Sequence, residues 1–308
     1  GTGDAVRVTS PLLEHQGVVL VLPGDAPLIK SSTLQALLDG HGDALCSVLT
    51  AHITPEEATN SGYGRIVRDE QGNTLAIVEA ANASPAQKAL TEINTGIYAF
   101  DSSWLFDEVL PHLKAHPPKN EYYLTDAIEE AAKKGRLQAI EHDNLTEVTG
   151  VNDRIALAEL QAQARLQINQ EWMAKGVRFE DPNCTYVDSD VVLAQDVELG
   201  PGVVLRGKTS IGTGAKIGAY CVIEDSQIAA NVIVASHSVL HGAVLEERST
   251  VGPFSRLREG THLGEESKIG NFVEVKKSRI GAGAKASHLS YLGDANVGER
   301  ANIGAGTI

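Results

Sequence analysis

Residues 251–292 read VGPFSRLREGTHLGEESKIGNFVEVKKSRIGAGAKASHLSYL, and an apolar residue marks every sixth position apart from one step of five. The same repeat, with a few further steps of five, runs from residue 187 to residue 303. The residues that mark it are Val187, Leu193, Leu199, Leu205, Ile211, Ile217, Ile223, Ile228, Val234, Leu240, Leu245, Val251, Leu257, Leu263, Ile269, Val275, Ile280, Ala286, Leu292, Val297 and Ile303. Neither an α-helix nor a plain strand has this period. It is typical of a parallel β-helix built from hexapeptide repeats, whose marked residues point inward.

This geometry predicts which side chains on neighbouring coils meet. Three hexads make one triangular coil of about 18 residues, and strands stack about 4.8 Å apart. Arg258 and Lys276 are 18 residues apart, and each directly follows an inward position. We therefore expect two cations to lie over one another, with an anion such as phosphate between them because like charges repel. The simpler alternative is that both side chains point into water, as surface cations commonly do.

A histidine lies close to this pair in the repeat. His288 comes two residues after Ala286, and Asn302 comes one residue before Ile303, which predicts the same face one coil later. Tyr291 follows at the next corner. A histidine beside such groups is a candidate general base toward an anionic substrate, although an exposed histidine without a role is the simpler interpretation. The solenoid histidines do not share one offset, so we expect no zinc site between coils.

The first half alternates short apolar strands with amphipathic segments, which predicts an α/β sheet. The expected strands are 18–22, of the buried type, 44–50, 77–79 and 93–100, and the expected helices are 32–38, 102–110 and 125–134. A run rich in Ala, Leu, Gln and Arg predicts a connecting helix over residues 152–175. The expected organisation is a first domain over 1–151, a connecting helix and linker over 152–185, and the solenoid over 186–308.

Composition narrows the class of protein. A formal net charge of −14 over 308 residues argues against a nucleic-acid-binding protein. No apolar run is long enough to predict membrane insertion. The three cysteines, Cys46, Cys184 and Cys221, have neither disulfide nor metal spacing, which favours a reducing, cytoplasmic location. Because the chain lacks an initiator Met and stops inside a hexad, we expect it to be a piece of a longer protein.

Several ordered motifs resemble one family of bacterial enzymes. Those in the solenoid are GPFSRLR (252–258), GNFVEVKK (270–277), HLSYLGD (288–294) and NIGAGTI (302–308). Those in the first half are GTG (1–3), GD (24–25), GYGRI (62–66), VE (78–79), EINTG (92–96) and GVNDR (150–154). Together they resemble the bifunctional N-acetylglucosamine-1-phosphate uridylyltransferase and glucosamine-1-phosphate N-acetyltransferase, which makes UDP-N-acetylglucosamine for the cell wall.

The resemblance implies an α/β fold: an incomplete Rossmann-like nucleotidyltransferase domain, the connecting helix and a left-handed parallel β-helix. It also implies a cytoplasmic homotrimer, formed through the β-helix, with UTP, sugar phosphates and acetyl-CoA as substrates and Mg²⁺ as cofactor. In the solenoid, it makes His288 the general base that acts on the amine of glucosamine-1-phosphate. The implied binding residues are Arg258 and Lys276 for the sugar phosphate, Tyr291 and Asn302 for the sugar, and the backbone of Ala305 for acetyl-CoA.

In the first domain, the resemblance implies that N-acetylglucosamine-1-phosphate attacks the α-phosphate of UTP and that pyrophosphate leaves. Asp25 and Asn152 would ligate Mg²⁺, which offsets the charge of phosphoryl transfer. The implied binding residues are Gly1 and Thr2 for the uracil and Gly64, Glu79, Asn94 and Asn152 for the substrate.

The sequence departs from the family in three ways. The family's later coils, with most of the acetyl-CoA contacts, lie outside this chain, so the resemblance does not by itself imply acetyl transfer by the chain alone. The Gly-rich loop that cradles the triphosphate lies outside this chain, so we expect no uridylyl transfer from the chain alone. Ala80-Ala81-Asn82 follows Glu79, where the family suggests a Lys-Asp pair. Two alternatives stay open. One is a single-function sugar-1-phosphate nucleotidylyltransferase with a structural solenoid tail, and the other is a non-enzymatic trimerisation solenoid.

Overall fold

The computed structural model describes residues 1–116 and 120–308. It divides into two compact units, Gly1–Leu160 and Gln161–Ile308. The division falls inside the long helix α7 (Arg154–Ala174), so this helix contributes residues to both units. The domain boundaries after residues 151 and 185 stay predictions. Within the described residues, no helix combines the length and the apolar composition that a bilayer crossing requires.

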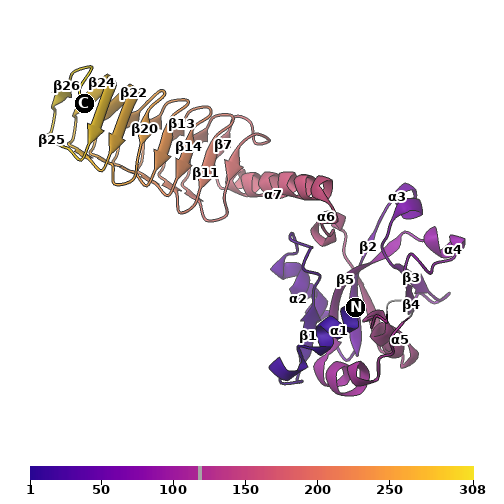
Figure 1. Cartoon of the computed structure of the whole chain (residues 1–308). Helices are drawn as coiled ribbons and strands as arrows, with labels where there is room; N and C mark the ends of the chain where they lie inside the picture. The colour runs from indigo at the N-terminus through magenta and orange to yellow at the C-terminus, as the bar shows by residue number, and fades with distance from the viewer. Residues whose placement is uncertain (117–119) are drawn as a thin grey trace. The chain divides into compact units, whose positions relative to one another are not determined.

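The first unit is built on a six-stranded mixed sheet in the order β4-β3-β5-β2-β6, with β1 paired to β5 (Figure 1). Its strands are β1 (Val18–Val21), β2 (Cys46–His52), β3 (Arg65–Arg68), β4 (Thr74–Val78), β5 (Glu92–Asp101) and β6 (Leu137–Glu141). Strands β2 and β6 are parallel, and the other pairs are antiparallel. The helices are α1 (Thr2–Arg7), α2 (Ser31–Asp39), α3 (Pro55–Asn60), α4 (Pro85–Lys88), α5 (Thr125–Lys133) and α6 (Leu145–Val148), with short η1 (Ser10–Leu12).

Three features of this unit differ from expectation. Strands β3 and β6 were not predicted, because neither has a long apolar run. Residues 102–110 do not form a regular α-helix but the π-helix η2 (Trp104–Val109), followed by the 3₁₀ turn η3 (Leu110–His112), where Pro111 lacks the N–H that an α-helical ladder needs. Val18, expected in a buried strand, is 43% exposed, since β1 pairs only with β5 among the described strands.

Alternating side chains on the central strands build two apolar clusters. On β2, Val48 packs into the cluster that holds Phe100 and Trp104, whereas Leu49 packs into the cluster that holds Leu37. Successive residues of a strand point to opposite faces, so β2 and β5 serve both clusters and the sheet is covered on each side. The carboxyl end of β1 therefore emerges beside a covered sheet, at Pro23-Gly24-Asp25.

The second unit is a parallel β-solenoid (Figure 1). Its strands are β7 (Arg178–Phe179), β8 (Tyr186–Val187), β9 (Val192–Leu193), β10 (Glu198–Leu199), β11 (Val204–Arg206), β12 (Ser210–Ile211), β13 (Lys216–Ile217), β14 (Val222–Glu224), β15 (Gln227–Ile228), β16 (Ile233–Val234), β17 (Val239–His241), β18 (Val244–Leu245), β19 (Thr250–Val251), β20 (Arg256–Leu257), β21 (His262–Leu263), β22 (Lys268–Lys276), β23 (Arg279–Ile280), β24 (Lys285–Gly293), β25 (Asn296–Val297) and β26 (Asn302–Ile303). One sheet of 13 strands joins two faces, because β22 runs through a corner, and a sheet of 7 strands forms the third face.

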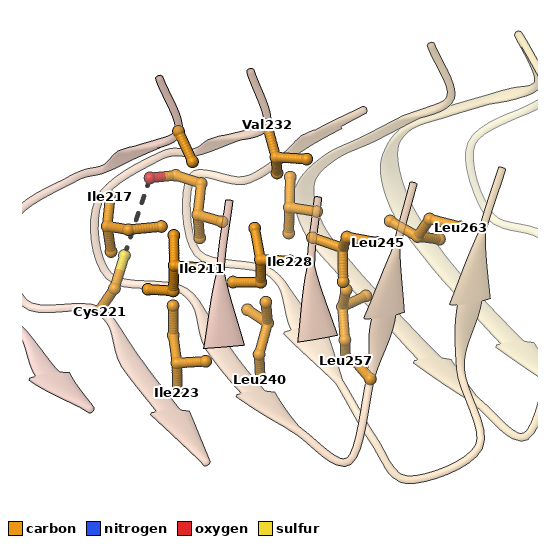
Figure 2. Close-up of a cluster of buried hydrophobic side chains, with 14 of the residues drawn as sticks. Ile211, Ile217, Cys221, Ile223, Ile228, Val232, Leu240, Leu245, Leu257 and Leu263 are labelled. Atoms are coloured by element: carbon orange, nitrogen blue, oxygen red, sulfur yellow. Dashed lines mark hydrogen bonds between the residues drawn. The ribbon is translucent and has the colours of Figure 1, made fainter. Parts of the chain in front are cut away.

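The marked residues form the solenoid core, as the repeat predicts. From Val187 to Leu292 they are at most 5% exposed, and Val297 and Ile303 are partly buried at the end. Figure 2 shows part of this stack, in which Ile223 lies in register with Leu240. Each such side chain contributes about 1.5–3 kcal/mol when buried, and each contacts mainly its neighbours in the adjacent coils.

Candidate functional site

The two predicted cations of the solenoid lie in one cavity. Leu257 pairs with Val275 in parallel register, and the Arg258 N–H donates to the Val275 carbonyl at 2.9 Å. Arg258 and Lys276, which follow these two residues, both line a cavity of about 420 Å³. The other residues that line it are Val239, His241, Arg256, Leu257, Glu259 and Lys277. The cavity is thus rich in cations, and its residues come from three successive coils.

A carboxylate that the sequence did not single out contacts Arg258. Arg258 Nη1 lies 3.1 Å from Glu274 Oε1, and both side chains are partly exposed. The chain itself therefore supplies part of the negative charge expected beside Arg258, and the guanidinium is held rather than free in water. Glu274 stands two residues before Lys276, on the same outward face, so the repeat contained the signal that identifies it.

Tyr291 lies on the same face of the solenoid, on the next coil. It lies in register with Glu274, and Gly293 lies in register with Lys276. The Tyr291 hydroxyl lies over Gly293, only 2.6 Å from where a Cβ would stand. The phenol therefore extends forward along its own strand to Gly293, the residue in register with Lys276. A side chain at residue 293 would displace the phenol from this position.

His288 is exposed and lies opposite Asn271 on the preceding coil. Asn302 lies one coil later, but it pairs with Lys285, three residues from His288, rather than with His288 itself. The reason is that Ala286 pairs with Ile303. His288 follows Ala286 by two residues, whereas Asn302 precedes Ile303 by one, so the two side chains lie three positions apart along the strand direction. Ala305 follows one coil beyond His288, where the Gly306 N–H donates to the Leu289 carbonyl at 2.8 Å.

In the first unit, three predicted residues line one largely apolar cavity of about 690 Å³: Thr2, Glu79 and Asn94. Gly64 adjoins it, because its carbonyl accepts the Asn94 N–H at 2.9 Å. Gly1 precedes Thr2, whose hydroxyl accepts the Leu124 N–H at 3.0 Å. The structure thus brings together Gly1, Thr2, Gly64, Glu79 and Asn94, whereas Asn152, also assigned to the substrate, does not line this cavity.

Two ionisable groups that line this cavity, Glu79 and Tyr98, have shifted pKa values. Burial raises the pKa of the Glu79 carboxyl. Asn94 Nδ2 donates to the buried Tyr98 hydroxyl at 2.8 Å, and burial raises the pKa of that phenol despite the hydrogen bond. The Asn94 Oδ1 accepts the Gly96 N–H at 3.0 Å, which fixes the orientation of the amide. The cavity therefore offers a buried carboxyl group and an amide of fixed orientation within largely apolar walls.

Asp25 and Asn152 lie on two segments of the same unit that contact each other through neighbouring backbone. The Val151 N–H donates to the Asp25 carbonyl at 2.9 Å, and the Asp25 carboxylate lies against Gly150, with Oδ2 3.0 Å from where a Cβ would stand. Both side chains are exposed. Carboxylate and amide oxygens are ligands that Mg²⁺ accepts, and an exposed pair leaves room for the waters that Mg²⁺ retains. The two residues therefore fit the predicted metal.

The described part of the solenoid also holds one group of three potential metal ligands. Glu224, Asp225 and His241 offer ligand atoms within 4.8 Å of one another. His241 is the only histidine of this group, and the strand register places it opposite Glu224. Counting histidines alone did not reveal the group, because two of its members are carboxylates.

Comparison with known proteins agrees with this architecture. A family model described as nucleotidyl transferase matches residues 1–172, and one described as GMPPB C-terminal domain matches residues 187–287. The fold and the family model over residues 1–172 thus define a nucleotidyl transferase that carries a β-helix domain, and hence an enzyme of the transferase class.

Full-length relatives make the assignment more specific. A bifunctional protein GlmU from Exiguobacterium sibiricum is 45% identical over 312 residues, which cover 100% of this chain and 68% of the relative. Proteins of the same name from Halalkalibacterium halodurans and a Geobacillus species are 42% and 45% identical, with 100% of this chain and 67% of each relative covered. The chain belongs to the family of bifunctional GlmU proteins, and its solenoid is the left-handed β-helix of that family. Bifunctional UDP-N-acetylglucosamine synthesis, which the sequence motifs imply, agrees with these findings.

Proposed function

We propose that the solenoid face of Arg258, Glu274, Lys276 and Tyr291 binds glucosamine-1-phosphate for acetylation. One observation carries the proposal: two cations from adjacent coils share a cavity, while a carboxylate and a phenol stand in register beside them. A structural tail would have no need of this arrangement. The cations would bind the phosphate, and Glu274 would keep Arg258 in place before the substrate arrives.

His288 is proposed as the general base for the transfer. It takes a proton from the substrate amine as the nitrogen attacks the thioester carbonyl of acetyl-CoA. The carbon–sulfur bond then breaks, an amide forms, and the thiolate of coenzyme A leaves. Asn302 and Ala305 lie one coil beyond. There, Asn302 would contact the sugar, and Ala305 would contact acetyl-CoA through its backbone. The exposure of His288 supports access of both substrates to its ring.

For the first unit, we propose uridylyl transfer between UTP and N-acetylglucosamine-1-phosphate as the reaction to which its cavity contributes. Thr2, Glu79 and Asn94 line the cavity that would hold the sugar nucleotide, and Gly64 adjoins it. Gly1 would contact the uracil with Thr2. Asp25 and Asn152 would hold Mg²⁺, which when bound offsets negative charge on the phosphates. The free thiols of Cys46, Cys184 and Cys221 suit a cytoplasmic enzyme.

We also propose that the solenoid assembles as a trimer through one corner. Tyr220, His237, Phe254 and Phe272 stack along this corner, with ring centroids 5.3, 4.9 and 5.5 Å apart. Tyr220, Phe254, Phe272 and the following Leu289 are each about half exposed. A continuous exposed row of large apolar groups is typical of a protein interface, and a second copy of this chain fits a periodic row of this kind.

Binding of glucosamine-1-phosphate to this chain tests the first proposal. Isothermal titration should detect binding, and Arg258→Ala should weaken it about tenfold or more, because a charge-assisted contact is lost. Arg279→Ala is the control, since Arg279 lies on the separate seven-stranded sheet. Equal affinities of all three proteins would reject the phosphate site and favour the single-function alternative.

The base is tested separately by the rate of acetyl transfer from acetyl-CoA to glucosamine-1-phosphate. His288→Ala should lower this rate by about 10²–10⁴-fold with little change in sugar-phosphate affinity. His262→Ala serves as control, since His262 pairs with Glu246 at 2.7 Å on another face. An unchanged rate in the His288 variant would show that another group removes the proton.

A further inference from the structure

A buried carboxylate outside both cavities joins two distant segments of the first unit. Glu147 is 4% exposed and lies on helix α6. Its Oε1 accepts the Lys30 N–H at 3.0 Å and also a hydrogen bond from the Thr33 hydroxyl. These partners are 117 and 114 residues away in sequence. The carboxylate thus occupies the amino end of helix α2, where a negative charge is favoured.

Its second oxygen is also surrounded by potential cations. Oε2 lies 3.4 Å from His142 Nε2 and 3.8 Å from Lys30 Nζ. Burial alone would raise the pKa of Glu147, but the bonds from Thr33 and the Lys30 backbone, with the charges of His142 and Lys30, outweigh it and lower the pKa. Glu147 is therefore held as a carboxylate with both oxygens engaged.

The segments that Glu147 joins are those that carry Asp25 and Asn152. Lys30 follows Asp25 by five residues, and Asn152 follows Glu147 by five residues. Beyond Glu147, the chain returns to the Asp25 loop through the bond from the Val151 N–H to the Asp25 carbonyl, at 2.9 Å. The contact of Gly150 with the Asp25 carboxylate closes the same ring of interactions.

We propose that Glu147 is a positioning residue, which sets the separation and orientation of Asp25 and Asn152 for a divalent cation. The inference rests on the proposed metal site. The segments 25–30 and 147–152 are joined at one end by Glu147 and at the other by the Val151–Asp25 hydrogen bond. This double connection restricts the movement of Asp25 relative to Asn152. Groups that orient metal ligands in this way typically change metal affinity by about 10–100-fold when replaced.

A purely structural role makes a different prediction. Removal of a buried charge partner would then lower the stability of the first unit without a selective effect on the ligand pair. Two measurements separate the roles. One is the affinity of the chain for Mn²⁺ in the presence of UDP-N-acetylglucosamine, followed by electron paramagnetic resonance of the free ion. The other is the hydrogen-exchange rate of the Val151 amide.

Glu147→Gln keeps the volume and removes the charge. We expect Mn²⁺ affinity to fall about tenfold and the Val151 amide to exchange at least tenfold faster, while amides in the centre of β2 keep their protection. Thr33→Val removes one hydrogen bond to Glu147 with a smaller structural change, and it should give the same effects at lower amplitude. Glu130→Gln is the matched control, because Glu130 pairs with Lys133 on the surface of the same unit.

The outcomes are distinguishable. If Glu147→Gln lowers the melting temperature but leaves both Mn²⁺ affinity and Val151 exchange unchanged, the positioning role is overturned. If Asp25→Asn does not alter Mn²⁺ affinity, the metal site itself fails. In that case, faster Val151 exchange in Glu147→Gln would still show the coupling of the two segments. If Asp25→Asn weakens Mn²⁺ binding and Glu147→Gln does not, only the positioning role is rejected.

Discussion

The two units fix their polar side chains in opposite ways. In the solenoid, Arg258 meets Glu274 because their strands are neighbours in register, one coil apart. In the sheet unit, Glu147 contacts Lys30, which is 117 residues away in sequence, and the two residues do not belong to a sequence repeat. In a periodic fold, the regular spacing of the repeat positions the residues of a site. In an irregular fold, a few buried, long-range contacts position them. Damage to one such contact should therefore spread further in the sheet unit.

The largest effect is expected at Arg65, which is fully buried. Its guanidinium donates to the Ala58 carbonyl at 2.6 Å and to the Tyr63 carbonyl. Arg65→Leu leaves these carbonyls without a donor, and it should destabilise the first unit by about 4 kcal/mol. Urea unfolding followed by Trp104 fluorescence, in a Trp172→Phe background, measures this.

Arg68→Leu is the control for Arg65, because it removes a more exposed ion pair with Glu92 and should cost about 1 kcal/mol or less. Equal effects of the two variants would break the comparison, since hydrogen bonds of a fully buried side chain would then be no more important than those of a more exposed ion pair.

A smaller and more local effect is expected in the solenoid. Leu257→Ala leaves a cavity in the inward stack and should cost about 3 kcal/mol. Because each coil contacts mainly its neighbours, amide exchange should accelerate in the adjacent coils and not near Val187. Val239→Ala, at an exposed position, is the control. Uniform acceleration along the whole solenoid would contradict the local character of this unit.

The corner row should affect association more than folding. Phe254→Ala combined with Phe272→Ala should change the unfolding free energy of one chain by less than about 1 kcal/mol, since both rings are about half exposed. The self-association constant, measured by sedimentation equilibrium, should fall at least tenfold. An unchanged association constant would remove the corner from the proposed interface.

The smallest effect is a pH dependence at Glu79. Its folded-state pKa is raised by burial, so ionisation destabilises the fold. Stability contributed by the protonated form is complete at low pH and declines as pH rises through the ordinary and then the raised pKa. Glu79→Gln should therefore stabilise the first unit near neutral pH and have no such effect in acid. Thermal unfolding at several pH values measures this, and a gain that grows toward acid would contradict it.

Much of the solenoid site follows from the sequence. The spacing of 18 residues placed Arg258 and Lys276 in one cavity, and the same counting would have found Glu274 two residues before Lys276. The repeat predicted the position of Asn302 less accurately. Its offset from Ile303 fixes its position along the strand, where it pairs with Lys285 and not with His288. In the sheet unit, the motifs indicated Thr2, Glu79 and Asn94 as site residues, but no spacing related them to one another.

The sequence by itself determined the inward stack of the solenoid, its register and the cation pair, because a fixed period converts residue number into position. It also indicated most strands of the first unit through their apolar runs. Only the tertiary structure decided that β1 lies at an edge, that Arg258 is held by Glu274 and that Glu147 ties the Asp25 and Asn152 segments together. Those contacts depend on how distant segments pack and on which buried charge finds a partner, and local sequence patterns do not carry that information.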